Sequence, residues 1–196
     1  MKKTLALALF VLTAAHGIAQ TSYTVDPAAA KMLWKGKKIT GQHSGTIHVK
    51  SGTINWNEQG LADATVDMDM TTIAVTGMSP ESAAELEGDL RSSAFFNTEA
   101  FKTATFKTTT ISPIAGAEAG KPNYNVTGDL TIKGITHPVT FAVLAWKDGN
   151  AVRAAGTLLF DRTWFDIKFR SGKFYDGLGD KMIEDMVELT FDVTGK

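Results

Sequence analysis

The chain has 196 residues, of which 43% are hydrophobic and 21% charged, and its formal net charge is −1. This is the composition of one ordinary globular domain, and it lacks the basic excess that nucleic-acid binding requires. Cysteine is absent, which excludes disulfides, thiolate chemistry, iron–sulfur clusters and lipid attachment through cysteine.

The N-terminus has the pattern of a secretory signal. Lys2 and Lys3 precede a short apolar run over residues 5–15, and Gly17 and Ala19 supply the small residues of a cleavage site. We therefore expect residues 1–19 to be a cleaved signal peptide and 20–196 a single domain, periplasmic or secreted. A retained membrane anchor is the weaker alternative because the run is too short to span a bilayer.

Period-two alternation of apolar and polar residues predicts the strands of the N-terminal half. The expected strands cover residues 23–26, 30–36, 44–49, 53–56 and 61–72, with a turn or bulge at 51–52 and a hairpin loop at 57–60. The clearest alternation is in 61–72, where Val66, Met68 and Met70 face one way and Asp67 and Asp69 the other. Such a strand has one buried and one exposed face.

A helical period interrupts this pattern over residues 78–101. Ser79 is typical of an N-cap, and Pro80 of the first position of a helix. Apolar residues then recur at helical spacing, at Ala83, Leu86 and Leu90. We expect a helical insertion across one end of a sheet, with a further turn at 97–101.

Strands resume after the insertion. They are expected over residues 103–111, 124–133, 138–147, 151–162 and 186–193, with a short one at 167–170 and loops at 112–123 and 174–185. Gly134 suits the positive φ of a tight hairpin turn. Pro138 cannot donate to a ladder, so it should begin its strand.

Eight or more antiparallel strands with one apolar face form a sheet that usually curls and closes. The fold class is therefore predicted to be all-β, an eight-stranded antiparallel barrel with a short helical insertion over one end. A barrel of this size is either filled by its own side chains or holds one ligand.

Several segments together resemble a known family. They are the runs at residues 130–139 (LTIKGITHPV) and 89–96 (DLRSSAFF), the short 104–106 (ATF) and 160–163 (FDRT), and the entry strand 23–26 (YTVD). In this combination and order the chain resembles the YceI-like, polyisoprenoid-binding, lipocalin-like proteins. The resemblance implies an extended lipocalin-like barrel that holds a long isoprenoid chain or similar amphiphile, in a periplasmic or secreted protein.

The residues that would face such a lumen are apolar. We expect the lumen and its mouth to be formed by Trp34, Val66, Met68, Met70, Phe95, Phe96, Phe106, Leu130, Ile132, Phe141, Val143, Leu158, Phe160 and Phe191. From the residues alone, the alternative is that these side chains fill the barrel completely. The resemblance favours an open lumen.

Charged residues near the expected mouth are candidates for contacting an anionic head group. They are Arg91, Lys133, His137, Arg162 and Arg170. For each of them, the alternative is an ordinary solvated surface residue. No cofactor or metal is expected, because the histidines lack ligand spacing and the acidic residues of 176–185 lack the spacing of an EF-hand.

The expected function is that of an exported binding protein that carries, stores or sequesters a long apolar or isoprenoid-type lipid. The sequence contains no nucleophile elbow, P-loop or dinucleotide fingerprint, so an enzyme is not expected. Two alternatives remain: a barrel enzyme that modifies a bound lipid through His137 or a nearby acid, and a packed stress-response barrel without ligand. The expected partners are the lipid and, transiently, a membrane, and the protein would be a monomer or homodimer.

Overall fold

The computed structural model describes residues 19–196, so the predicted signal peptide lies outside the described residues except for Ala19. The strands are β1 (Thr21–Thr24), β2 (Lys31–Lys38), β3 (Gly41–Asn57), β4 (Gly60–Thr76), β5 (Thr103–Pro113), β6 (Tyr124–Ile132), β7 (Ile135–Asp148), β8 (Ala151–Asp161) and β9 (Ile183–Gly195). The helices are α1 (Pro80–Arg91) and two 3-10 turns, η1 (Arg162–Phe165) and η2 (Gly179–Lys181). Among these residues no helix has the length and apolar character that crossing a bilayer needs.

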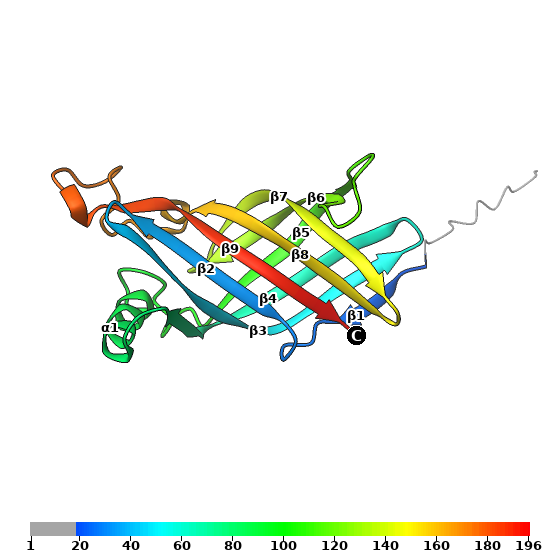
Figure 1. Ribbon diagram of the computed structural model, residues 1–196, viewed down its shortest axis with the longest axis horizontal. Helices are drawn as coiled ribbons and strands as arrows, with labels where there is room; N and C mark the ends of the chain where they lie inside the picture. Colours follow the sequence, from blue (N-terminus) through cyan, green and yellow to red (C-terminus); the bar gives the residue numbers. More distant parts are fainter. Residues whose placement is uncertain (1–18) are drawn as a thin grey trace, which may run out of the picture.

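The strands form one antiparallel sheet in the order β1-β3-β2-β9-β8-β7-β6-β5-β4, and pairing of β3 with β4 closes it. Strands β2 to β9 make the predicted eight-stranded barrel, which is confirmed (Figure 1). β1 is an additional strand that pairs with Thr53–Trp56 of β3, whereas β2 pairs with the first part of β3, from Gly41 to Thr46. A single long strand therefore has two partners on one edge.

β3 and β4 are longer than predicted because bulges hide their continuity. The expected strands 44–49 and 53–56 are one strand with a register shift between Val49 and Ser51, so the bulge lies at Lys50, one residue before the turn or bulge expected at 51–52. In β4 the alternation breaks after Met70 because Asp69 binds its own neighbours. The Asp69 carboxylate accepts from the Thr71 amide at 3.0 Å, and its carbonyl accepts from the Thr72 hydroxyl at 2.6 Å.

The helical insertion lies at one end of the barrel, as predicted (Figure 1). The Ser79 hydroxyl accepts from the Ser82 amide at 3.3 Å, and Leu90 is buried against the sheet. The further turn is a single one, in which the Phe101 amide donates to the Asn97 carbonyl at 2.9 Å. This α1 end also carries the β2–β3 turn, the β6–β7 turn and the segment between β8 and β9.

The β6–β7 turn has the predicted geometry, with φ of 52° at Lys133 and 72° at Gly134. The placement of Pro138 at the start of a strand was wrong, because β7 begins at Ile135. β7 pairs with β8 only from Val143 onward, so Pro138 lies in the part of β7 that has no partner in β8. The absence of a backbone N–H donor at Pro138 therefore costs little stability.

The predicted strand at 167–170 was also wrong, since these residues lie in an irregular segment with a turn at 169–170, between η1 and η2. Two of their carbonyl groups accept hydrogen bonds from a side chain, and only the Arg170 carbonyl accepts from a strand residue, the Ile183 amide at 2.9 Å. The Arg162 guanidinium donates to the carbonyls of Ile167 and Phe169 at 2.8 and 2.9 Å. An alternating pattern cannot reveal this, because the competing donor is a side chain.

Candidate ligand-binding lumen

Two hollows lie inside the barrel. The outer cavity, at the α1 end, has a volume of about 320 Å³, and the inner hollow, in the middle and toward the opposite end, about 60 Å³. Ligand pockets for small molecules typically measure about 300–1,000 Å³. The outer cavity is therefore large enough to hold a ligand, and the alternative of a completely filled barrel does not describe this interior.

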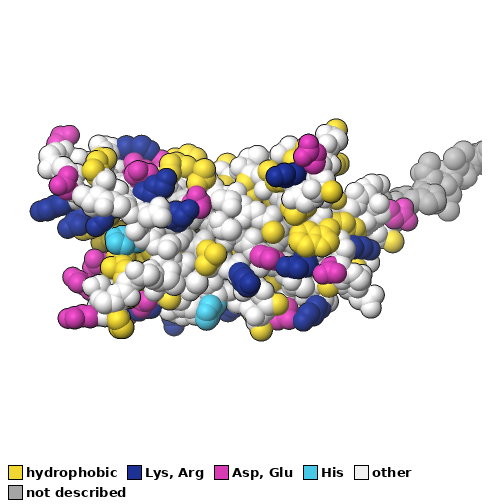
Figure 2. All heavy atoms as spheres, viewed as in Figure 1, with side chains coloured by type: hydrophobic (Ala, Val, Ile, Leu, Met, Phe, Trp, Pro, Cys, Tyr) yellow, Lys and Arg dark blue, Asp and Glu magenta, His cyan; other side chains and the backbone are white. Residues whose placement is uncertain are grey.

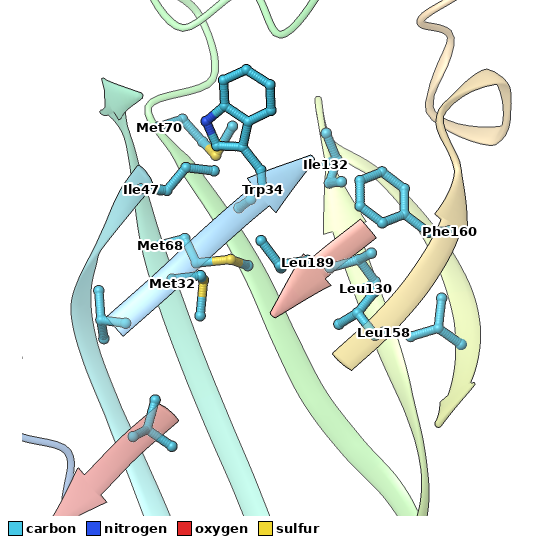
Figure 3. Packing of buried hydrophobic residues seen from close by; sticks show 14 of the residues in the cluster. Met32, Trp34, Ile47, Met68, Met70, Leu130, Ile132, Leu158, Phe160 and Leu189 are labelled. Carbon is cyan, nitrogen blue, oxygen red and sulfur yellow. The ribbon is translucent and has the colours of Figure 1, made fainter. Parts of the chain in front are cut away.

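Alternate residues of the strands form the wall of the outer cavity. Trp34, Met70, Ile132 and Phe160 come from four different strands and point toward a common space (Figure 3). The Trp34 ring is held by a hydrogen bond from its Nε1 to the Ala74 carbonyl at 3.1 Å. Each of these strands exposes its other face to water, which is why the period-two pattern is so clear.

Residues of the helical insertion and of the segment after η1 cover the outer cavity. Leu86 and Leu90 of α1 line it, as do Phe95 and Phe96. The Phe95 ring packs against that of Phe169, with centroids 5.4 Å apart. The two predicted mouth aromatics therefore contact the cavity, with Phe95 buried and Phe96 half-buried.

The outer cavity reaches the surface beside these residues, and charged groups surround its mouth. Exposed lining residues include Lys37, Arg170, Asp180 and Lys181. Figure 2 shows basic and acidic side chains mixed at this end, whereas the middle of the barrel carries few charges in this view. The remaining charged or titratable lining residues are Lys38, His43, Asp89, Arg162 and Glu184.

Most of these mouth charges are free to meet a ligand. Within residues 19–196, Lys37, Lys38, Arg170 and Lys181 take part in no ion pair, and the same holds for Asp89, Asp180 and Glu184. Partial burial, and then the nearby positive charge of Lys38, lower the pKa of His43 below its usual value. The neutral imidazole is therefore favoured in the ligand-free protein.

The inner hollow is lined by apolar side chains, with Thr108 as the polar exception. Phe106, Phe141 and Phe191 point into it from three strands and stay only half-buried, because they border empty space. Their rings pack in sequence, with centroids 5.3 Å apart for Phe106 and Phe141 and 5.8 Å for Phe141 and Phe191. All the residues that line this hollow are buried or half-buried, in contrast to the exposed residues at the mouth of the outer cavity.

The structure places every predicted lumen residue on the lining of one of the hollows. Those on the outer cavity alone are Trp34, Met70, Phe95, Phe96, Ile132 and Phe160. Those on the inner hollow alone are Val66, Phe106, Phe141, Val143, Leu158 and Phe191. Met68 and Leu130 border both hollows.

The head-group candidates are divided. Arg162 and Arg170 line the outer cavity, but Arg91, Lys133 and His137 do not. Arg91 donates to the Ile73 carbonyl at 2.7 Å and to Glu87 at 3.1 Å.

Lys133 and His137, the other two candidates that do not line the cavity, also have partners outside the lumen. Lys133 donates from Nζ to the Asp166 carbonyl at 3.1 Å. The ring of His137 packs against Trp164 and Phe165, with centroids 5.6 and 5.4 Å away. The position of a residue at or beside a hairpin near the predicted mouth therefore did not establish that its side chain enters the cavity.

Arg162 lines the cavity but already has several partners. Its side chain is 4% exposed, its Nη2 lies 3.2 Å from the Asp185 carboxylate, and its donors bind four backbone carbonyls. Burial lowers the pKa of Arg162, while the negative charges of Asp185 and Asp161 oppose that change. Arg162 therefore holds the segment between β8 and β9 in place and is not available for a head group.

Sequence reasoning missed several lining residues at the mouth. Lys38 could have been found, because it continues the inward phase of Met32 and Trp34, and His43 shares the phase of Ile47 on β3. Lys181 and Phe169 gave no such signal because they lie in irregular segments. Among the described residues, no group of three or more histidine or acidic side chains is arranged to hold a metal ion.

Comparison with known proteins identifies relatives over most of the chain. A family model described as the YceI-like domain matches residues 23–195. A UPF0312 protein of Photorhabdus laumondii is 36% identical over 140 residues, which cover 71% of this chain and 67% of that protein. Protein YceI of Escherichia coli O157:H7 is 32% identical over 96 residues, which span 49% of this chain and 45% of that protein.

Solved structures share the barrel. Burkholderia cenocepacia BcnA matches 88% of this chain and 99% of its own with a TM-score of 0.68 at 24% identity. A polyisoprenoid binding domain from Saccharophagus degradans matches 92% of this chain and 99% of its own with a TM-score of 0.62 at 14% identity. At these identities the likeness establishes the fold. Because the family model covers nearly the whole described barrel, the chain belongs to the YceI-like family.

Proposed function

We propose that this protein is an exported binding protein that holds an apolar, isoprenoid-type chain in its lumen without transforming it. The observation that carries the proposal is the outer cavity, which is lined mainly by apolar side chains and reaches the surface at the α1 end. The description of the Saccharophagus degradans neighbour as a polyisoprenoid binding domain supports the same class of ligand.

The charges indicate which way the ligand lies. All the charged residues that line the two hollows lie on the outer cavity, and the inner hollow has none. A polar head group is favoured at the mouth, where Lys37, Lys38, Arg170 and Lys181 can contact an anion. The chain then extends inward along the apolar wall.

Transfer energetics favour carriage or storage. Burying a methylene group away from water gains about 0.8 kcal/mol, so the lumen can keep an insoluble chain in solution. Moving the same chain from a bilayer into the lumen changes its free energy very little, because lipid tails are already apolar. Exchange with a membrane is therefore reversible, and contacts at the mouth set its selectivity.

Exposed apolar residues near the α1 end suit a transient membrane contact. Ile39, Trp164, Phe174 and Tyr175 are between 48% and 58% exposed. Aromatic side chains of this kind prefer the interface between water and lipid. Together with the adjacent basic residues, they would place the mouth against a membrane during loading or release.

The two alternatives have less support. An enzyme that acts through His137 is disfavoured because this ring packs against η1 and does not line either hollow. A packed barrel without ligand is disfavoured by the size of the outer cavity. Export rests on the N-terminal signal pattern, and N-terminal sequencing of protein recovered from its native cells tests it by showing whether Gln20 is the first residue.

Native mass spectrometry of the purified protein, before and after lipid extraction, tests the binding proposal. We expect a bound apolar molecule that is lost on extraction and replaced by added farnesol. Ala104→Phe, which adds a ring inside the outer cavity, should abolish this binding. Ala155→Phe adds the same ring on the half-exposed outer face of β8 and should leave binding unchanged. Extracted protein that takes up no apolar chain, or equal binding by both variants, would contradict the proposal.

A further inference from the structure

On three strands that reach both hollows, the boundary falls between two consecutive inward-facing residues. On β2 the inner hollow is lined by Met32 and the outer cavity by Trp34, two residues further along. The same step separates Phe106 from Ala104 on β5, and Leu158 from Phe160 on β8. A transverse layer of side chains therefore crosses the barrel here.

Three residues make up this layer, and we call them the collar: Met68, Leu130 and Leu189. They come from β4, β6 and β9, and within the described chain they alone line both hollows. Their exposed fractions are 3%, 1% and 6%. Figure 3 shows them across the middle of the barrel, with Trp34, Met70 and Ile132 on the mouth side.

We propose that the collar sets the length of the chain that the lumen accepts, and that Met68 is the residue that decides it. This inference rests on the proposed function. A chain that enters from the mouth meets the collar after the outer cavity, so a single-chain amphiphile of moderate length, fatty or prenyl, fills the site. A longer chain has to displace the collar to use the inner hollow.

Met68 is the member of the collar best suited to move. Its side chain is unbranched and has three rotatable bonds, so it adapts to different apolar neighbours more readily than leucine. It also has free volume on two sides, because it borders both hollows. Rotation of Met68 can therefore change the passage between the hollows without moving a strand.

Chain-length series measured by titration calorimetry test this inference. The probes are saturated fatty acids from octanoate to stearate and, separately, the prenols geraniol, farnesol and geranylgeraniol. In the unchanged protein we expect affinity to rise by up to about fourfold per methylene until the chain reaches the collar, and then to level off. The two series show whether a straight or a branched chain fits better.

The decisive variant is Met68→Ala, which joins the hollows. Its affinity should keep rising beyond the point at which the unchanged protein levels off, giving at least a tenfold gain for the longest chains. Met70→Ala is the matched control, because Met70 loses the same atoms on the same strand but lines the outer cavity alone. The chain length at which the affinity of the Met70 variant stops rising should be the same as in the unchanged protein. If Met68→Ala does not fold, Leu189→Ala opens the same collar from β9.

The outcomes separate this inference from the proposed function. If affinity shows no levelling point in the unchanged protein, or if the Met68 and Met70 variants shift it equally, the collar does not set chain length. If none of the chains binds to any of the proteins, the proposed function itself fails.

Discussion

Arg162 and Asp185 form an ion pair, with 3.2 Å between Nη2 and Oδ1, in a place where their side chains are only 4% and 14% exposed. The same guanidinium donates to the carbonyls of Ile167, Phe169, Ile183 and Glu184. One side chain therefore fixes both ends of the segment that joins η1 to β9. Because Ile167, Phe169 and Ile183 also line the outer cavity, Arg162 determines the shape of the mouth.

Replacing Arg162 should strongly lower the free energy of unfolding. Arg162→Ala leaves Asp185 and several carbonyls without their buried partner, and removal of one member of a buried pair typically costs about 3–5 kcal/mol. Arg153→Ala is the control, since the pair of Arg153 with Asp192 is about one-third exposed and such pairs contribute about 1 kcal/mol or less. Urea unfolding measures both. Equal losses of unfolding free energy would show that Arg162 does not have this structural role.

Asp161 should make stability depend on acid pH. Burial raises the pKa of Asp161, but hydrogen bonds from Lys173 and from the hydroxyl and amide of Thr163 outweigh it, so the pKa lies below its ordinary value of 3.8. The ionised carboxylate therefore stabilises the fold above this ordinary value, and that contribution is lost as the pH falls through the lower, folded-state pKa.

Asp161→Asn removes the titrating group and keeps one oxygen acceptor for Thr163. We expect its unfolding free energy to fall less steeply on acidification than that of the unchanged protein. Urea unfolding at a series of acid pH values measures this difference. Parallel curves for the two proteins would contradict it.

Gly128 and Gly88 should respond to alanine in opposite directions. A Cβ at Gly128 would lie 2.6 Å from the Lys107 carbonyl oxygen and would collide with the Phe106 ring, so the variant should lose about 1–3 kcal/mol. A Cβ at Gly88, within α1, meets nothing within 4 Å. Alanine there should stabilise by about 0.5–1 kcal/mol. Thermal unfolding of both variants measures these changes, and a stabilised Gly128→Ala would show that the barrel wall is looser than described.

His43 should report an anionic head group at the mouth. Burial and Lys38 lower the pKa of His43 in the free protein, and a bound anion nearby would favour the protonated ring and raise that pKa. Titration of the histidine resonances by NMR should show this rise with decanoate but not with decanol. His48, exposed on the outer face, provides the internal reference. If both ligands leave the His43 titration unchanged, the head group lies elsewhere.

The regular parts of this fold could be predicted from the sequence because one face of each strand is buried. The alternation of Val66, Met68 and Met70 with Asp67 and Asp69 identified a barrel strand directly. The N-cap at Ser79 located the start of α1 for a similarly local reason. The lumen residues on the strands followed from strand phase, whereas Phe95 and Phe96 were expected at the mouth because they follow the helix; all of them line one of the hollows.

The mouth could not be predicted in the same way, because long-range contacts of single side chains shape it. The network of Arg162 links residues more than twenty positions apart in sequence, such as Asp185. Lys133 lies at the β6–β7 turn and His137 lies on β7 just beyond it, yet each contacts the segment after β8. The collar could not be predicted from the sequence either, since it depends on which inward residues of three strands meet at one level of the barrel.

The central claim is that the outer cavity binds an apolar chain. Titration calorimetry of lipid-free protein with farnesol at several temperatures tests it most directly, because burial of apolar surface gives a negative change in heat capacity. The account predicts one chain bound per protein, a clearly negative heat-capacity change, and loss of both in Ala104→Phe. No saturable binding at any temperature, or the same binding by Ala104→Phe, would contradict it.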